Sequence, residues 1–170
     1  MAISTSTDQL PAPRVAELDT ITAQAEAIDE LIALARHRIQ VFDQDLSQTG
    51  WNSPARADRL AAFLREVRGR RLDIIVHDTR FLERACPRMV DLLRNYGHVM
   101  TIYRTGAEAK IATDPLLIVD GVHYLHRFHF EQPRAALGVS QPEQTKPLAS
   151  RFEEIWATGE PGVTGTVLGL

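Results

Sequence analysis

The chain has 170 residues, enough for one domain with a buried core. Its hydrophobic fraction of 44% and charged fraction of 24% are typical of globular proteins, which excludes wholesale disorder and a fibrous class. A net charge of -3 gives no overall attraction to nucleic acid or anionic lipid, and the single cysteine, Cys86, excludes an internal disulfide and a cysteine-based zinc site.

Two features predict a cytoplasmic protein without a membrane partner. No apolar run approaches the length that spans a bilayer. The opening residues, MAISTSTDQLPAPR, also lack the basic region followed by an apolar region that marks a secretion signal.

The apolar residues predict a succession of helices and strands after a flexible N-terminal arm over residues 1–16. Helical spacing predicts an amphipathic helix over 18–35, and Ser53-Pro54 is a preferred helix start. The other predicted elements, in chain order, are a strand over 38–42, a helix over 53–68, a strand over 72–76, a helical segment over 79–96, strands over 98–103, 116–119 and 122–130, a loop over 131–145, a helix around 152–156 and a tail over 159–170.

This order of elements predicts an α/β fold, built as a three-layer α/β/α sandwich around a mixed β-sheet. Strands that alternate with helices in the first hundred residues favour parallel pairing with helices on both faces. The later strands are joined by a tight turn at Asp120-Gly121 and must therefore pair antiparallel. We expect one domain over residues 17–158.

The stretch TDPLLIVDG, residues 113–121, lies at the centre of a resemblance to a known superfamily. Its apolar strand and Asp-Gly turn, the hairpin strand after it and the closing Phe152-x-x-x-Trp156 helix follow the same order as one half of a phospholipase D-like fold, over roughly residues 18–157. The chain also resembles a family of uncharacterised bacterial domains that sometimes follow an acetyltransferase domain. The resemblance implies a homodimer, because the halves of this fold pair, and an acetyltransferase domain as a possible partner.

The catalytic motif of that superfamily, H-x-K-x-x-x-x-D, is degenerate in this chain. Thr113 stands where the resemblance places the attacking His, Pro115 replaces the Lys, and Asp120 is retained. The Gly-Ser-x-Asn stretch of the superfamily falls on residues 127–130, which are Arg-Phe-His-Phe here. Covalent phosphoryl transfer needs a nucleophile and cations that hold the phosphate. The sequence therefore predicts no catalytic residues.

The densest group of polar residues is HYLHRFHF, residues 123–130. On a strand, alternate residues share a face, so His123, Arg127 and His129 lie on one side. His123 and His129 would be about 20 Å apart on a regular strand, too far for one metal ion. We expect Asp120, His123, Arg127 and His129 to bind a phosphate-containing or acidic ligand, without a metal or other cofactor. Alternatively, these residues pair with neighbouring carboxylates or cover a subunit contact.

Acidic residues also close several strands. The stretch VFDQD, residues 41–45, resembles the opening of haloacid-dehalogenase-type phosphatases, but no adjacent pair of acids follows at a later strand end, which favours acidic caps. Asp43, Asp78 and Asp120 are expected at related strand ends, where open α/β sheets hold ligands.

Together these features predict a non-catalytic phospholipase D-like domain that acts as a binding or regulatory module. The alternative is a phosphodiesterase or nuclease that uses His123, Arg127 and His129 in place of the standard set. A third hypothesis, an accessory domain for an acetyltransferase, follows from the resemblance alone.

Overall fold

The computed structural model describes residues 9–66 and 68–164, and a single mixed sheet runs through them. Its strand order is β1-β7-β6-β5-β2-β3-β4-β8, in which β2, β3 and β4 are parallel neighbours and all other pairs are antiparallel. The strands are β1 (Arg14–Leu18), β2 (Arg38–Asp43), β3 (Arg71–Val76), β4 (Met100–Arg104), β5 (Leu116–Val119), β6 (His123–Arg127), β7 (Ala135–Val139) and β8 (Glu160–Val163).

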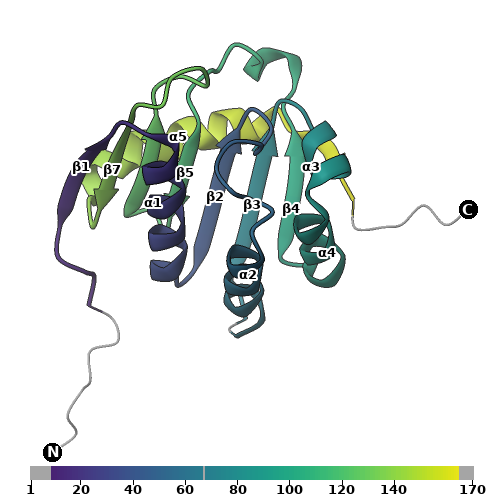
Figure 1. Cartoon of the computed structure of the whole chain (residues 1–170), viewed down its shortest axis with the longest axis horizontal. Helices are drawn as coiled ribbons and strands as arrows, with labels where there is room; N and C mark the ends of the chain where they lie inside the picture. Colours follow the sequence, from purple (N-terminus) through teal and green to yellow (C-terminus); the bar gives the residue numbers. More distant parts are fainter. Residues whose placement is uncertain (1–8, 67, 165–170) are drawn as a thin grey trace, which may run out of the picture.

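Helices cover both faces of this sheet (Figure 1). The helices α1 (Ile21–Leu34), α2 (Pro54–Glu66), α3 (Arg80–Ala85) and α4 (Pro87–Tyr96) lie on one face, and α5 (Pro142–Ala157) crosses the other. A short 3-10 turn, η1 (Ala107–Ala109), follows β4. The arrangement confirms the predicted three-layer α/β fold with a mixed sheet.

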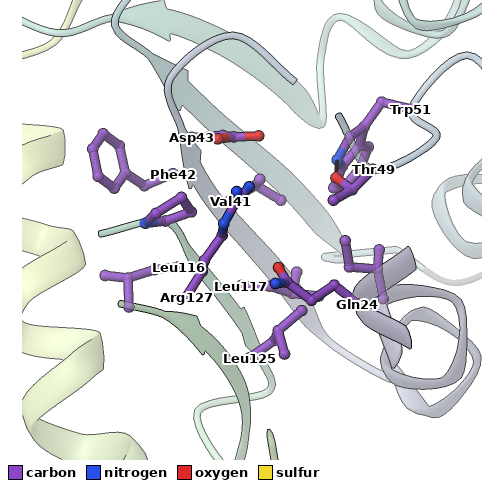
Figure 2. A pocket seen from close by; sticks show the side chains of 12 residues that line it. Gln24, Val41, Phe42, Asp43, Thr49, Trp51, Leu116, Leu117, Leu125 and Arg127 are labelled. Atoms are coloured by element: carbon purple, nitrogen blue, oxygen red, sulfur yellow. Dashed lines mark hydrogen bonds between the residues drawn. The ribbon is translucent and has the colours of Figure 1, made fainter. Parts of the chain in front are cut away.

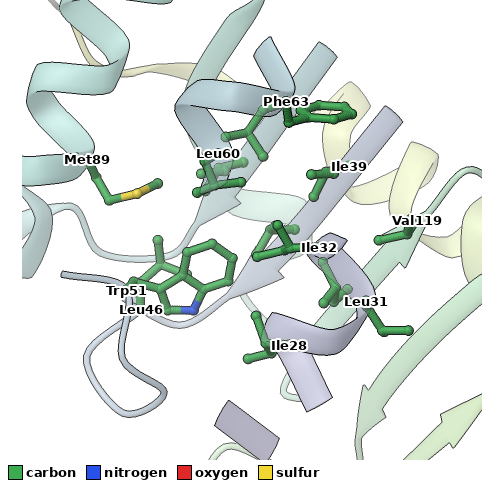
Figure 3. Packing of buried hydrophobic residues seen from close by; sticks show 14 of the residues in the cluster. Ile28, Leu31, Ile32, Ile39, Leu46, Trp51, Leu60, Phe63, Met89 and Val119 are labelled. Carbon is green, nitrogen blue, oxygen red and sulfur yellow. The ribbon is translucent and has the colours of Figure 1, made fainter. Parts of the chain in front are cut away.

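One apolar core lies on each side of the sheet, because successive strand residues point to opposite faces. The larger core packs α1, α2 and α4 against the sheet and contains Trp51 and Leu60 (Figure 3). The smaller core lies under α5 and contains Phe42 and Phe152. Both faces of β2 and β3 are buried, which explains why these strands are rich in apolar residues. Gln40 and Asp73 are their buried polar exceptions.

Three strands, β1, β7 and β8, were not predicted from the sequence. The predicted loop over 131–145 is wrong, since β7 occupies its middle and α5 begins at Pro142. The stretch AALGV has little intrinsic strand preference, so pairing with β6 and β1 makes it a strand. Gly138 fits this place because the Tyr124 ring lies across it, with Cε1 only 2.2 Å from where a Cβ would be.

The boundary expected at residue 16 lies within the edge strand β1, and the one expected at residue 158 lies just before the edge strand β8. Arg14–Leu18 pairs with β7 and Glu160–Val163 pairs with β4, so both segments belong to the sheet. Residues 1–8 of the predicted arm and 165–170 of the predicted tail lie outside the described residues. Among the helices that the structure describes, none combines the length and apolar character needed to cross a membrane.

Candidate ligand-binding site

The site begins with Asp43, the last residue of β2. Its Oδ1 accepts a hydrogen bond from the backbone N–H of Gln44 at 2.7 Å. Burial raises the pKa of Asp43 to about 6, and the neighbouring Asp45 acts in the same direction, while the Gln44 N–H and the Arg127 charge oppose them. The carboxyl group therefore titrates close to neutral pH.

Arg127, the last residue of β6, provides the opposing charge. β6 runs in the same direction as β2 with only β5 between them, so the two strands end at the same edge of the sheet. The arginine is only 6% exposed and extends toward Asp43 (Figure 2). Burial lowers the pKa of Arg127 and the Asp43 carboxylate raises it, but a guanidinium remains charged.

The loop after β6 and the loop after β2 hold this guanidinium. Nε donates to the carbonyl of Gln132 at 2.6 Å, and Nη2 donates to the carbonyl of Phe130 at 2.7 Å. Nη1 donates to Oε1 of Gln48, an exposed residue, at 2.5 Å. Since each terminal nitrogen carries two hydrogens, these bonds use one hydrogen of Nη1 and one of Nη2.

A small cavity of about 30 Å³ lies between these charges and helix α1. That volume holds about two water molecules. Its lining is mostly apolar and comprises Gln24, Ile28, Val41, Phe42, Asp43, Thr49, Trp51, Pro115, Leu116, Leu117, Leu125 and Arg127. A much wider open groove, of about 460 Å³, lies on the other side of Arg127 and is lined by Gln48 and Phe130 among others.

Buried hydrogen bonds fix the polar wall of the cavity that faces α1 and α2. Gln24 donates from Nε2 to the carbonyl of Pro133 at 2.6 Å, and Thr49 Oγ1 accepts from the Trp51 indole at 3.0 Å. Arg56, only 2% exposed, donates from Nη1 to the carbonyl of Thr49 at 2.5 Å. Its guanidinium also lies over the Trp51 ring, 4.9 Å from the centroid. These contacts of Arg56 anchor the loop after β2 to α2.

His77 closes the same sheet edge on the α5 side. Its ring packs between Phe42 and Phe130, with centroid distances of 5.2 and 5.6 Å. Nε2 lies 2.7 Å from the carbonyl of Ala112, which only accepts, so Nε2 carries the hydrogen and Nδ1 accepts from the Thr105 hydroxyl at 2.6 Å. Burial lowers the pKa of His77, so the imidazole is neutral with both nitrogens bonded.

Thr113 and Pro115 contribute backbone carbonyls at this edge. The carbonyl of Thr113 accepts from the N–H of Phe130 at 2.9 Å, and that of Pro115 accepts from the N–H of Arg127 at 3.0 Å. These bonds continue the pairing of β5 and β6 and place the Arg127 side chain. Neither residue supplies an imidazole or an amine.

The four binding residues predicted from the sequence lie in two groups, at the opposite ends of the strands. Arg127 and His129 are at the edge with Asp43, whereas Asp120 and His123 are at the far ends of β5 and β6. Asp120 accepts from the backbone N–H groups of residues 36, 37 and 38 at 2.8, 2.7 and 2.9 Å. His123 is 2% exposed, and its Nδ1 accepts from the N–H of Ser140 at 2.8 Å.

The predicted strand over 122–130 ends at Arg127, so His129 belongs to a loop. His129 Nδ1 accepts from the N–H of Glu131 at 3.1 Å. The predicted alternation is confirmed for the strand itself, since Leu125 belongs to the core on the α1 side, while His126 bonds to Asp114, which Arg151 of α5 also binds. No group of three His, Cys, Asp or Glu side chains that could hold a metal was found in residues 9–66 and 68–164.

One polar cluster on the α5 side was not predicted. Asp114 Oδ2 lies 2.9 Å from Nε2 of His126, and Arg151 binds both carboxylate oxygens at 2.9 and 2.5 Å. Burial raises the pKa of Asp114, but the hydrogen bonds from His126 and Arg151 outweigh it and lower the pKa. The alternation of side chains along a strand places His126 on the face opposite to that of Arg127. Asp114 lies between the two altered motif positions, Thr113 and Pro115. No local sequence pattern indicates that Arg151 of α5 binds Asp114.

The fold is similar to the folds of solved phospholipase D family structures. It is similar to Nuc, a phospholipase D family member from Salmonella typhimurium, with a TM-score of 0.60 and 18% identity over 87% of this chain and 97% of that one. It is also similar to NucT from Helicobacter pylori, with a TM-score of 0.58 and 13% identity over 88% of this chain and 99% of that one. The match to TrmBL2, an archaeal chromatin protein that binds DNA, has a TM-score of 0.67 and 14% identity over 93% of this chain. This chain spans only 57% of the length of TrmBL2.

Residues 20–164 match the family model described as Domain of unknown function (DUF7931), and the chain belongs to that family. No curated protein matches the chain.

Proposed function

We propose that this chain is a non-catalytic phospholipase D-like domain that binds a small acidic ligand between Asp43 and Arg127. The observation that carries the proposal is a buried guanidinium facing a carboxyl group across a cavity at the carboxyl end of β2. Ligands of open α/β sheets bind at this edge. Buried polar groups of this kind are ordinarily matched by partners, which a bound acid supplies.

The altered motif supports a role without hydrolysis. A phosphoryl-transfer site needs a nucleophile and a cation beside the phosphorus. At the positions where the resemblance expects them, Thr113 and Pro115 provide backbone carbonyls to the β5–β6 pairing. The retained Asp120 is bound by three backbone N–H groups at the opposite edge. We infer that the superfamily motif is degenerate here and that Asp120 is structural.

A second candidate function, a phosphodiesterase with a non-standard site, is favoured by one observation. The Asp114 carboxylate is within hydrogen-bond distance of the His126 imidazole, which is how many enzymes orient a general base. Purified protein is expected to show no hydrolysis of bis(p-nitrophenyl) phosphate above the buffer rate. Hydrolysis that disappears in His126→Gln but persists in His98→Gln would establish this second function in place of the first.

Binding is tested by adding acetate, propionate, phosphate and sulfate at constant ionic strength and recording the melting temperature and amide NMR shifts. At least one anion is expected to shift the resonances of residues around Asp43 and Arg127. Arg127→Lys, which keeps the charge but loses the planar fork, should abolish these shifts. Arg151→Gln removes a different partly buried arginine and serves as the matched control. Absence of any anion-dependent shift in the folded wild-type protein would overturn the proposal.

The assembly is a further part of this proposal. We expect a homodimer, because the halves of the resembling superfamily pair, and an acetyltransferase domain as one possible partner. Light scattering during size-exclusion chromatography gives the mass in solution directly. A monomer at all accessible concentrations would remove the homodimer from the proposal.

A further inference from the structure

We infer that the acid bound between Asp43 and Arg127 is a short monocarboxylate, of acetate to propionate size, and not a phosphate. The inference rests on the proposed binding function and specifies its ligand. Three properties of the site carry it: the donors that Arg127 retains, the size and apolar lining of the cavity, and the carboxyl group of Asp43 on the opposite wall.

The donors of Arg127 match a planar carboxylate. Its hydrogen bonds to Gln48 and Phe130 leave one further hydrogen on each terminal nitrogen. A carboxylate accepts two parallel N–H bonds from such a fork. An anion reaches these donors through the outer groove past Gln48, an exposed and neutral side chain, so its entry separates no ion pair.

The cavity admits only a small apolar group. Its volume of about 30 Å³ corresponds to two water-sized groups, enough for a methyl or ethyl group. Beyond Arg127 and Asp43, its wall contains the side chains of Val41, Leu117 and Leu125. Each methylene buried there increases affinity about fourfold. A phosphate has four hydrated oxygens and no apolar part, so the apolar part of this lining offers it no compensating contact.

Asp43 selects among anions by its own charge. A carboxylate that approaches Arg127 also approaches Asp43, so the two acids must share one proton. The other charged groups that act on Asp43 are Arg127 from β6 and Asp45 from the same loop. Because the pKa of Asp43 is about 6, taking up that proton reduces affinity only about tenfold at pH 7. Once protonated, the carboxyl group donates a hydrogen bond to the ligand.

Isothermal titration calorimetry tests the inference by measuring the affinity of the whole chain for acetate, propionate, hexanoate and inorganic phosphate at pH 5.5 and 7.5. Propionate should bind about fourfold more tightly than acetate, and hexanoate should bind more weakly than either. Affinity for propionate should be about twentyfold higher at pH 5.5 than at pH 7.5. Asp43→Asn should bind propionate with no such dependence on pH, while Leu125→Phe, which fills the cavity without changing charge, should lose propionate binding.

The outcomes separate this inference from the proposed function. Phosphate binding that depends on Arg127, without carboxylate binding, would overturn the inference and leave the binding function in place. Absence of binding by every anion would overturn both. Propionate binding that survives in Arg127→Lys but not in Arg151→Gln would place the ligand elsewhere and also overturn the inference.

Discussion

The carboxylate of Asp120 accepts a hydrogen bond from the backbone N–H of Arg38 at 2.9 Å, which ties the end of β5 to the start of β2. The same carboxylate binds the N–H groups of residues 36 and 37. Asp120 itself has a positive φ of 55°, which Asp and Asn tolerate better than most side chains. The one residue retained from the superfamily motif is therefore a structural anchor of the sheet.

Asp120→Ala is expected to lower the free energy of unfolding by about 2–4 kcal/mol, because it leaves three backbone donors without their acceptor. Urea denaturation followed by circular dichroism measures this loss. Asp120→Gly relieves the positive φ but also removes the carboxylate, so its smaller loss isolates the hydrogen bonds. Asp58→Ala, at an exposed site on α2, is the control and should change stability by less than about 0.5 kcal/mol. Equal stabilities of Asp120→Ala and wild type would contradict the anchoring role.

Gly138→Ala is expected to destabilise the protein by about 2–3 kcal/mol, since the new methyl group would lie 2.2 Å from the Tyr124 ring. Removing the ring should relieve the clash. The double variant Gly138→Ala with Tyr124→Ala should therefore lose less stability than the sum of the two single variants. Thermal unfolding of all four proteins completes the double-mutant cycle. Strict additivity would show that contact with the Tyr124 ring contributes nothing to the cost of Gly138→Ala.

Asp43→Asn should stabilise the protein at pH 7.5 but not at pH 4. An acid whose pKa is raised from 3.8 unfolded to about 6 folded binds more protons in the folded state between these values, so stability falls as pH rises through this range. A shift of about two units corresponds to about 2–3 kcal/mol. The difference between variant and wild type, measured by urea denaturation at both pH values, isolates this group from other acids. A difference that does not change with pH would contradict the raised pKa.

His77 is expected to be the neutral tautomer with its hydrogen on Nε2. Long-range ¹H–¹⁵N NMR spectra distinguish protonated from unprotonated ring nitrogens and should show Nδ1 as the acceptor at pH 6.5. Because burial lowers the pKa of His77, the ring should remain neutral as the pH falls below 6.5, and stability should decrease there. His37, an exposed histidine in the same spectrum, serves as the internal reference. A charged His77 at pH 6.5 would show that the hydrogen bond to Thr105 is made differently.

The central strands and the helices that follow them could be predicted from the sequence because their patterns are local. The apolar runs of β2, β3 and β5 and the turn after β5 have the composition that the structure requires. β7 lacks such a pattern, since its sequence AALGV has little strand preference and Gly138 makes room for the Tyr124 ring of β6. β1 and β8 pair with strands far away in the sequence, and no local preference indicates them.

The candidate site could be predicted only in part for the same reason. Strand alternation correctly placed Arg127 on the face of Leu125, and the strand-end rule drew attention to Asp43. The guanidinium meets Gln48 from a loop 79 residues earlier, a contact that alternation does not contain. His123 has the same face as Arg127 but lies at the other end of β6, because sharing a face does not bring residues to one edge.

The edge position of β1 has a practical consequence for expressing shortened forms of the protein. A chain started at residue 17, where the sequence composition changes, would lack most of the strand that covers β7. The exposed backbone of β7 would then be free to recruit another molecule by strand addition, as uncovered sheet edges do. Preparations that begin before Arg14 should stay dispersed at concentrations where those that begin at residue 17 precipitate.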